Sequence, residues 1–196
     1  MRKVLLSLFF VFTFAGAAFS QSGQWQLDKA HSSVSFTVSH MVISEVTGTF
    51  RDFDITLMSS KDDFTDASIE ATINVASIST NNERRDGHLK TDDFFNAEKY
   101  PQIKFTSMSM EKVGEKDYRI HGKLTIRDIT KVVTFDALYE GSLQTAHGSL
   151  AAWKATTSIN RFDYGLKWNR TIETGGLVAG ETVTITLALE FNRQST

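Results

Sequence analysis

The sequence predicts an all-β domain of eight mostly antiparallel strands, with one short helical insertion between the third and fourth strands. Two observations predict this fold class. Apolar and polar residues alternate in eight separate segments, and one charged segment interrupts the alternation. A period of two gives each strand one apolar and one polar face, as in antiparallel sheets with one buried face. Such strands build a sandwich or a closed barrel, and closure leaves no exposed edge strand.

Before the first strand, residues 1–20 are predicted to be a secretory signal peptide. Two cationic residues precede an apolar run over 4–14, and a small-residue cleavage signal ends at Ser20, before Gln21. The run is shorter than the ~20 residues that cross a bilayer as a helix. We therefore expect a periplasmic or secreted protein, cleaved near Ser20/Gln21, whose single domain is 21–196.

Composition removes several classes of function. The chain has 21 Lys and Arg against 23 Asp and Glu, and the predicted leader contains two of the cations, so the remainder is acidic. Nucleic-acid binding is not expected, because it requires a basic face. The absence of cysteine excludes disulfides, thiol catalysis and cysteine-based zinc sites. No cofactor is expected.

The eight predicted strands follow one another without a repeat or a linker. Their approximate ranges are 32–40, 53–58, 68–76, 103–110, 118–126, 133–139, 152–160 and 182–191. Two strands change phase: Phe50 is out of step with Phe53, and Met108 and Met110 are out of step with Phe105. We interpret both changes as bulges, which bend a strand and help a sheet to curl.

The inward faces of these strands are the candidate ligand-binding surface. They contribute Phe36, Val38, Phe53, Ile55, Ile73, Val75, Phe105, Leu124, Ile126, Phe135 and Trp153. An eight-stranded barrel is either filled by its own side chains or holds one ligand. The small residues Ala71, Ala137 and Ala155 interrupt the larger ones and favour a channel, but periodicity alone leaves both readings open.

The interrupting segment, 80–101, is predicted to be helical. Thr80 and Glu83 match a capping box, and Pro101 marks the return to strand because it cannot continue a helix. The apolar face of this insertion consists of Leu89, Phe94 and Phe95, which complete the predicted ligand-binding set.

The same segment contains the one dense polar cluster, Asp86 and His88 with Asp92 and Asp93 nearby. No histidine spacing matches a zinc motif, and no G-x-S-x-G nucleophile elbow occurs. We favour helix capping and salt bridges for the cluster and predict neither a metal site nor catalytic residues. A lipid-modifying enzyme that uses Asp86 and His88 is the alternative.

Six stretches together resemble the YceI family of exported bacterial proteins, the lipid- or polyisoprenoid-binding YceI-like domain. They are WQLDKAHSSVSFTVSHM (25–41), VTGTFRDFDITL (46–57), SISTNNERRDGHLKTDDFFNAEKYPQIKF (77–105), GKLTIRDITKVVTF (122–135), INRFDYGLKW (159–168) and VAGETVTITL (178–187). The run RDGHLKTDDFF…KYP is the most specific. Two departures, Asp128 for the usual glycine and Val132 for the usual proline, fall at one inter-strand turn and question its geometry.

The resemblance implies an eight-stranded antiparallel barrel, lipocalin-like in shape, that holds a long amphiphile in an apolar tunnel. Its ligands resemble polyisoprenoid quinone-type lipids or fatty chains with a polar end. Burial gains about 0.8 kcal/mol per CH₂, so a tunnel lined by Val, Ile and Phe can bind such a chain. Arg85, Asp86 and His88 would fix the helix or meet the head group.

Three functions are therefore weighed: a lipid carrier, a lipid-modifying enzyme on the same barrel, and a structural module with a filled core. A carrier implies a membrane that donates or accepts its lipid. A homodimer is left open.

Overall fold

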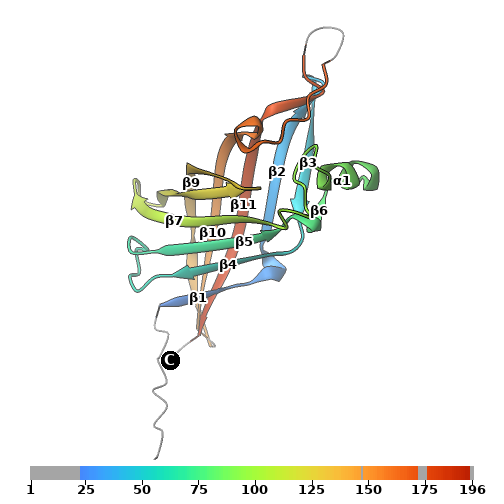
Figure 1. The fold of residues 1–196 in the computed structure, drawn as a ribbon. Coiled ribbons are helices and arrows are strands. Elements are labelled where there is room, and N and C mark those ends of the chain that lie inside the picture. The colour runs from blue at the N-terminus through green and yellow to red at the C-terminus, as the bar shows by residue number, and fades with distance from the viewer. Residues whose placement is uncertain (1–22, 147, 172–175, 195–196) are drawn as a thin grey trace, which may run out of the picture.

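The chain forms a closed antiparallel barrel with one short helix at its rim (Figure 1). The computed structural model describes residues 23–146, 148–171 and 176–194, and the predicted signal peptide, 1–20, lies outside them. The elements in order are β1 (Gln24–Leu27), η1 (Lys29–His31), β2 (Ser33–His40), β3 (Ser44–Phe50), β4 (Phe53–Met58), β5 (Ser68–Asn74), η2 (Val75–Ser77), β6 (Ile78–Ser79), α1 (Glu83–Lys90), β7 (Gln102–Lys112), β8 (Asp117–Ile126), β9 (Ile129–Thr145), β10 (Gly148–Asn160), η3 (Arg161–Tyr164) and β11 (Ala179–Gln194).

Three pairs of short strands each share one position in the barrel. β1 and β2 both pair with β11. On one side β4 pairs with β1 and β5 pairs with β4, and on the other β3 pairs with β2 and β6 pairs with β3. β7 to β11 follow in sequence order, and the β1–β11 pairing closes the ring. The predicted eight-stranded antiparallel barrel is thereby confirmed.

Of the two predicted bulges, the one at Phe50 is wrong, because the chain breaks there into two strands, and the one in β7 corresponds to a register shift within a continuous strand. β3 ends at Phe50 and β4 begins at Phe53, with an exposed bend between them, so that both rings are buried. In β7 the register shifts between Ser107 and Ser109. The predicted strands do not include β1, β3 and β6; β1 and β6, of four and two residues, are too short to show a clear alternation.

The predicted helical insertion is shorter than its segment, and its predicted cap is wrong. α1 begins after Asn82, whose side-chain oxygen accepts from the Arg85 amide at 3.0 Å. Thr80 is buried, and its hydroxyl donates instead to the Asp86 carboxylate at 2.5 Å. The Thr80 hydroxyl is therefore not the cap of the helix amides. Turns over 91–100 complete the insertion before β7.

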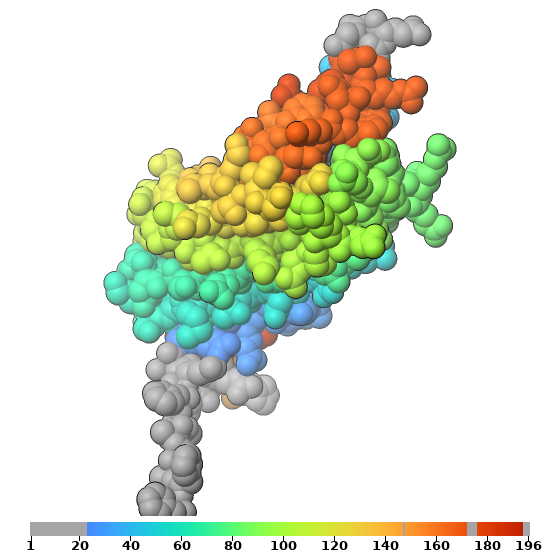
Figure 2. All heavy atoms as spheres, in the orientation of Figure 1, coloured from blue at the N-terminus to red at the C-terminus, as the bar shows by residue number. Residues whose placement is uncertain are grey.

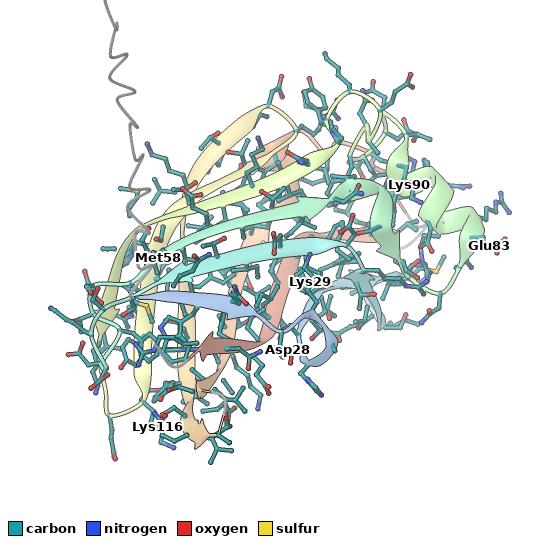
Figure 3. All side chains as sticks on the ribbon, turned by 90° about the horizontal axis from the view of Figure 1, so that it is seen from below. Asp28, Lys29, Met58, Glu83, Lys90 and Lys116 are labelled. Atoms are coloured by element: carbon teal, nitrogen blue, oxygen red, sulfur yellow. The ribbon has the colours of Figure 1, made fainter. Side chains whose placement is uncertain are left out.

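From the side shown in Figure 2, β4, β5, β7 and β8 form a continuous outer wall, with α1 projecting beside the segment 160–171 at one end. Figure 3 shows that α1, from Glu83 to Lys90, lies at the end of the barrel opposite Met58 and Lys116. No helix among the described residues is both long and apolar enough to cross a membrane.

An aromatic cluster fills the barrel at the end opposite α1. Phe64, from the β4–β5 connection, lies 5.3 Å from Trp25 and 5.1 Å from Trp153 between ring centroids. Tyr118 and Tyr139 pack on Trp153 at 5.0 and 4.8 Å. Large rings from β1, β8, β9 and β10 therefore close this end of the interior.

Candidate functional site

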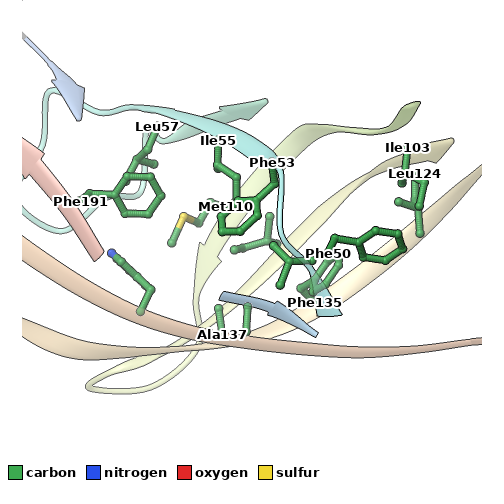
Figure 4. Close-up of a cluster of buried hydrophobic side chains, with 14 of the residues drawn as sticks. Phe50, Phe53, Ile55, Leu57, Ile103, Met110, Leu124, Phe135, Ala137 and Phe191 are labelled. Carbon is green, nitrogen blue, oxygen red and sulfur yellow. The ribbon is translucent and has the colours of Figure 1, made fainter. Parts of the chain in front are cut away.

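Inside the barrel, between the aromatic cluster and α1, lies a cavity of about 640 Å³. Its walls are almost entirely apolar and come from strands all around the ring. Figure 4 shows part of this wall, where Ile55 and Leu57 of β4 lie near Met110 of β7 and Phe135 of β9. A volume of this size lies within the range of pockets that enclose small organic ligands.

The predicted ligand-binding side chains fall largely on this cavity. Those that line it are Phe36, Val38, Ile55, Ile73, Leu89, Phe94, Phe95, Phe105, Leu124, Ile126, Phe135 and Trp153. Phe53 and Val75 do not line it, although both are buried. Val75 begins η2, where its amide donates to the Pro101 carbonyl at 2.9 Å. Alternation identifies the inward side of a strand but does not tell where the interior is packed and where it is hollow.

Small residues keep the cavity open. Ala71, Ala137 and Ala155 line it, as the sequence analysis expected of a channel. Gly48 lies directly opposite Phe36 in the β2–β3 pair, and a Cβ on Gly48 would overlap the Phe36 ring. The ring therefore occupies the space of the missing side chain and lies against the wall. This arrangement leaves the centre of the barrel unfilled.

The polar groups of the cavity gather at the end that carries α1. Asn82, Arg84, Arg85 and His88 line this end. Among the described residues that line the cavity there is no Asp or Glu. The mouth beside α1 is therefore cationic, whereas the rest of the cavity wall is apolar.

Arg85 and Asp86 have different roles at the mouth. The Arg85 guanidinium donates to the Thr80 hydroxyl at 2.7 Å and to the Thr80 carbonyl at 2.8 Å. Asp86 accepts from the Thr80 amide at 2.8 Å and does not line the cavity. Asp86 therefore fixes the start of the helix, and Arg85 both fixes it and faces the cavity.

His88 is held by partners other than Asp86. Its Nε2 lies 2.7 Å from the Asp93 carboxylate, and its ring packs edge-on against Phe94 and Trp168. The Asp86 carboxylate is engaged by Thr80. The two residues of the alternative catalytic pair are thus each bound to a different group, and the hydrogen bonds of the described chain do not join them.

Sequence reasoning missed Arg127, which fastens the insertion to the barrel. Arg127 opens the β8–β9 turn with φ at 57°. Its guanidinium donates to the carbonyls of Phe94 at 3.0 Å and Gly165 at 3.2 Å, and to the Asp92 carboxylate at 2.7 Å. Because 33 to 38 residues separate Arg127 from these carbonyl partners, no local motif could have indicated the contact.

The two departures from the family pattern lie away from the cavity. Asp128 is the second residue of the β8–β9 turn and accepts from the Tyr100 hydroxyl at 3.1 Å. Val132 lies on β9 and is exposed. Only Asp128 therefore lies in the predicted turn, Val132 being part of a strand, and neither side chain lines the cavity.

Arg161, also missed, is a buried cation at the same end of the cavity. Its guanidinium donates to the carbonyls of Leu166, Trp168, Ala179 and Gly180 at 2.6 to 3.0 Å. Burial lowers the pKa of Arg161, an effect that the charge of Glu181 partly opposes. Four carbonyls satisfy this side chain, so it joins η3 and the following segment to the start of β11.

A second polar cluster lies outside the cavity, at the β1–β2 connection. Asp28, His31 and Glu190 bring ligand-type atoms within 4.8 Å of one another. The hydrogen bond between Asp28 and His31 lowers the pKa of the carboxyl and raises the pKa of the imidazole. Asp28 also caps η1 by accepting from the Ala30 amide at 2.9 Å, so a structural role accounts for the group.

The fold and the cavity define a class of protein: a closed antiparallel barrel, plugged at one end, that encloses an apolar space with a cationic mouth. The chain belongs to the YceI-like domain family, whose model matches residues 25–191. The resemblance noted in the sequence is thereby confirmed.

Known relatives and solved structures agree with this assignment. A UPF0312 protein of Staphylococcus aureus strain MSSA476 is 37% identical over 167 residues, which cover 84% of this chain and 95% of that protein. The crystal structure of the Campylobacter jejuni YCEI protein is 30% identical with a TM-score of 0.70, covering 86% of this chain and 97% of that one. A domain from Saccharophagus degradans, described as polyisoprenoid-binding and implicated in plant cell wall breakdown, shares the fold at 18% identity with a TM-score of 0.61, covering 86% and 97%.

Proposed function

We propose that this protein is an exported, non-enzymatic lipid carrier that holds one long-chain amphiphile in the barrel cavity. The observation that carries the proposal is the apolar cavity of about 640 Å³. A hydrocarbon chain gains about 0.8 kcal/mol for each CH₂ removed from water. Such a cavity therefore supplies affinity through chain length, with few polar contacts.

Of the ligand classes that fit, a polyisoprenoid, a quinone-type lipid and a fatty-chain derivative share a long apolar chain and a polar end. The polar end belongs at the mouth, where Arg84, Arg85 and His88 line the cavity. The chain then runs toward the aromatic cluster at Trp153. The description of the Saccharophagus degradans domain supports a polyisoprenoid among these candidates.

Two further observations support a carrier over an enzyme and over a filled module. The separate partners of Asp86 and His88 favour binding without turnover. The small side chains of Ala71 and Ala155 on the cavity wall, and the Phe36 ring packed against Gly48, favour a hollow interior. The predicted leader supports export to the periplasm or the medium, where a membrane would donate or accept the lipid.

Native mass spectrometry of the purified protein tests the proposal. Wild-type protein is expected to carry a lipid of a few hundred daltons or more. Ala71→Phe places a ring in the cavity and should abolish this adduct, whereas Thr72→Phe, on the neighbouring position of the same strand, should keep it. A protein that is free of lipid and rejects every long-chain amphiphile would overturn the carrier. A folded Ala71→Phe variant with unchanged occupancy would place the lipid elsewhere.

The enzyme alternative has its own readout. Incubation of the loaded protein followed by mass analysis of the extracted lipid should return the lipid unchanged. A lipid product that disappears in His88→Ala, with the fold intact by circular dichroism, would establish catalysis instead.

A further inference from the structure

The turn between β2 and β3 exposes three consecutive large apolar side chains. Met41, Val42 and Ile43 are 43%, 67% and 90% exposed. The other large apolar side chains that are exposed in the described chain stand singly in the sequence. Single exposed apolar residues are ordinary, whereas a contiguous group marks an interaction surface.

The apolar residues of this turn also adopt backbone angles that such residues rarely have. Met41 and Val42 have φ of 50° and 69°. Positive φ in a hairpin turn is normally occupied by Gly, Asn or Asp, and for a β-branched residue it is strained. The turn thus combines strain with exposure, since no contact within the described chain buries these side chains. An apolar environment outside the molecule would compensate the exposure.

The turn lies at the mouth of the cavity and is firmly held there. The Met41 amide donates to the Val178 carbonyl at 2.9 Å, and the Ser44 hydroxyl donates to the His40 carbonyl at 3.1 Å. His40 and Val178 themselves line the cavity. The three apolar side chains therefore stand next to the cavity wall, at the end of the barrel formed by β2, β3 and the segment before β11 (Figure 1).

Charge does not decide the partner of this surface. Arg170 lies beside the turn, because its carbonyl accepts from the Val178 amide at 2.8 Å, and Lys167 precedes it. Glu45 and Glu181 lie on β3 and β11 at the same end. Two exposed cations and two exposed anions thus lie near this turn in the described chain. The apolar side chains are what remains to attract a partner.

We propose that Met41, Val42 and Ile43 form a membrane-docking tip that inserts into the interfacial region of a lipid bilayer. A rigid turn with apolar side chains at its end, flanked by polar Ser39 and Ser44, suits the boundary between head groups and acyl chains. Insertion would hold the cavity mouth against the membrane. This consequence for lipid exchange rests on the proposed carrier function, whereas docking itself does not.

Vesicle flotation tests the docking tip. The full exported chain is mixed with phosphatidylcholine vesicles or with vesicles that also contain phosphatidylglycerol. Wild-type protein is expected to float with both. Val42→Asn combined with Ile43→Ser should reduce partitioning by about tenfold or more, since binding scales with the inserted apolar area. Asn suits the positive φ at position 42, so the variant should fold.

Val132→Ser combined with Leu143→Ser is the matched control. Both control residues are 63% exposed and apolar, but they lie on β9, and their replacement should leave flotation unchanged. Wild-type protein that floats with neither vesicle would overturn the proposal. The proposal would also be overturned if the tip variant and the control lost flotation equally. It would be overturned as well if the wild type floated only with anionic vesicles and the tip variant still did so.

A spectroscopic readout locates the contact. The chain contains no cysteine, so Ile43→Cys provides a single site for an environment-sensitive fluorophore. Its emission should shift to the blue on addition of vesicles, and the emission of labelled Val132→Cys should not. If the tip instead joins two copies of the chain, sedimentation would show a dimer for the wild type and a monomer for the tip variant. The emission of the label at position 43 would then not change on addition of vesicles. That result also overturns docking.

These outcomes separate docking from the carrier function. The tip variant should keep its lipid adduct in native mass spectrometry, because its substituted side chains do not line the cavity. Ala71→Phe should lose the adduct and still float. Loss of both properties in each variant would indicate misfolding, which circular dichroism would report.

Discussion

At the scale of single residues, the pairing of a glycine with an aromatic ring keeps the interior hollow. A methyl group on Gly48 would overlap the Phe36 ring and also approach the Thr80 methyl within 2.9 Å. The ring is the group that can move, because the space beside it is empty. The cavity therefore depends on a residue that has no side chain of its own.

Gly48→Ala is expected to turn the Phe36 ring into the cavity and to weaken lipid binding by about tenfold, which is ~1.4 kcal/mol. The stability of the lipid-free protein should change by only about 1 kcal/mol, because alanine also removes the entropic cost of glycine in a strand. Lipid titration and urea unfolding measure the two effects. The double change Gly48→Ala with Phe36→Ala should restore the room and the binding; a double variant as weak as Gly48→Ala would contradict the argument.

A second residue-scale prediction concerns Tyr164, whose buried hydroxyl has no hydrogen-bond partner among the described residues. Burial raises the pKa of Tyr164 to about 12, with a smaller contribution from Asp163. Because the folded pKa exceeds the unfolded value, the folded state favours the protonated phenol. Its stabilising effect is complete below about pH 10 and is lost as the pH rises to about 12.

Tyr164→Phe should therefore leave stability at neutral pH nearly unchanged and make the protein more resistant to alkali. The wild type should lose about 2 to 3 kcal/mol more than the variant over that alkaline window. Urea unfolding at several pH values measures this difference. Tyr118→Phe is the control, because its hydroxyl donates to the Asp63 carbonyl at 2.9 Å and its loss should cost about 1 kcal/mol at neutral pH. Parallel alkaline curves for wild type and Tyr164→Phe would refute the assignment.

At the scale of elements, the helical insertion is attached to the barrel mainly through side chains. α1 forms few contacts with the strands apart from β6. Arg127, from the β8–β9 turn, provides the connection to the segment that carries Phe94 and Phe95. The β8–β9 turn, which contacts this segment through Arg127, therefore positions the mouth of the cavity.

Arg127→Met is expected to destabilise the protein by about 1 to 2 kcal/mol, the lower range for hydrogen bonds of a charged group whose carboxylate partner is exposed. The larger effect should be local: amide hydrogen exchange over 91–97 should accelerate, and lipid should dissociate faster. Arg119→Met on β8 is the control, because its contact with Asp136 is exposed at 3.6 Å, and its effect should stay within about 0.5 kcal/mol. An unchanged rate of amide hydrogen exchange over 91–97 in Arg127→Met would show that the insertion keeps its structure without the Arg127 contacts.

At the scale of the whole molecule, a protein without disulfides is stabilised by closure and by its packed end. The β1–β11 pairing closes the ring of strands, and among the described strands the sheet ends only at β6, beside β3. The aromatic cluster around Trp153 fills one end of the interior and the cavity occupies the rest. The packed end of the barrel thus stabilises the fold, and the hollow end is available for a ligand.

Export is the prediction that belongs to this scale. Expression of the whole gene in a bacterial host should yield periplasmic or secreted protein that begins at or near Gln21. N-terminal sequencing of the exported material measures it. A change of Ser20 to a bulky charged residue should block processing and serves as the control. Exported protein that retains Met1 or Arg2 would contradict a cleaved leader.

Several features of this protein were determined by the sequence alone. Alternation in segments such as 32–40 and 182–191 predicted the strands and their inward faces, and the charged run before Pro101 predicted the insertion. The phase change after Phe105 predicted the register shift in β7, whereas the one at Phe50 marks a break between β3 and β4. These features depend on neighbouring residues, because the period of a strand and the limits of proline act locally.

Only the tertiary structure decided which inward side chains face a cavity and which are packed. Phe95 lines the cavity, whereas Phe53 is packed in the barrel wall. The Thr80 hydroxyl donates to Asp86 and does not cap the helix amides. The tertiary structure also brought Arg127 to Phe94 and Arg161 to Ala179. These outcomes depend on contacts between segments distant in sequence, where shape and hydrogen-bond geometry, and not periodicity, choose the partner.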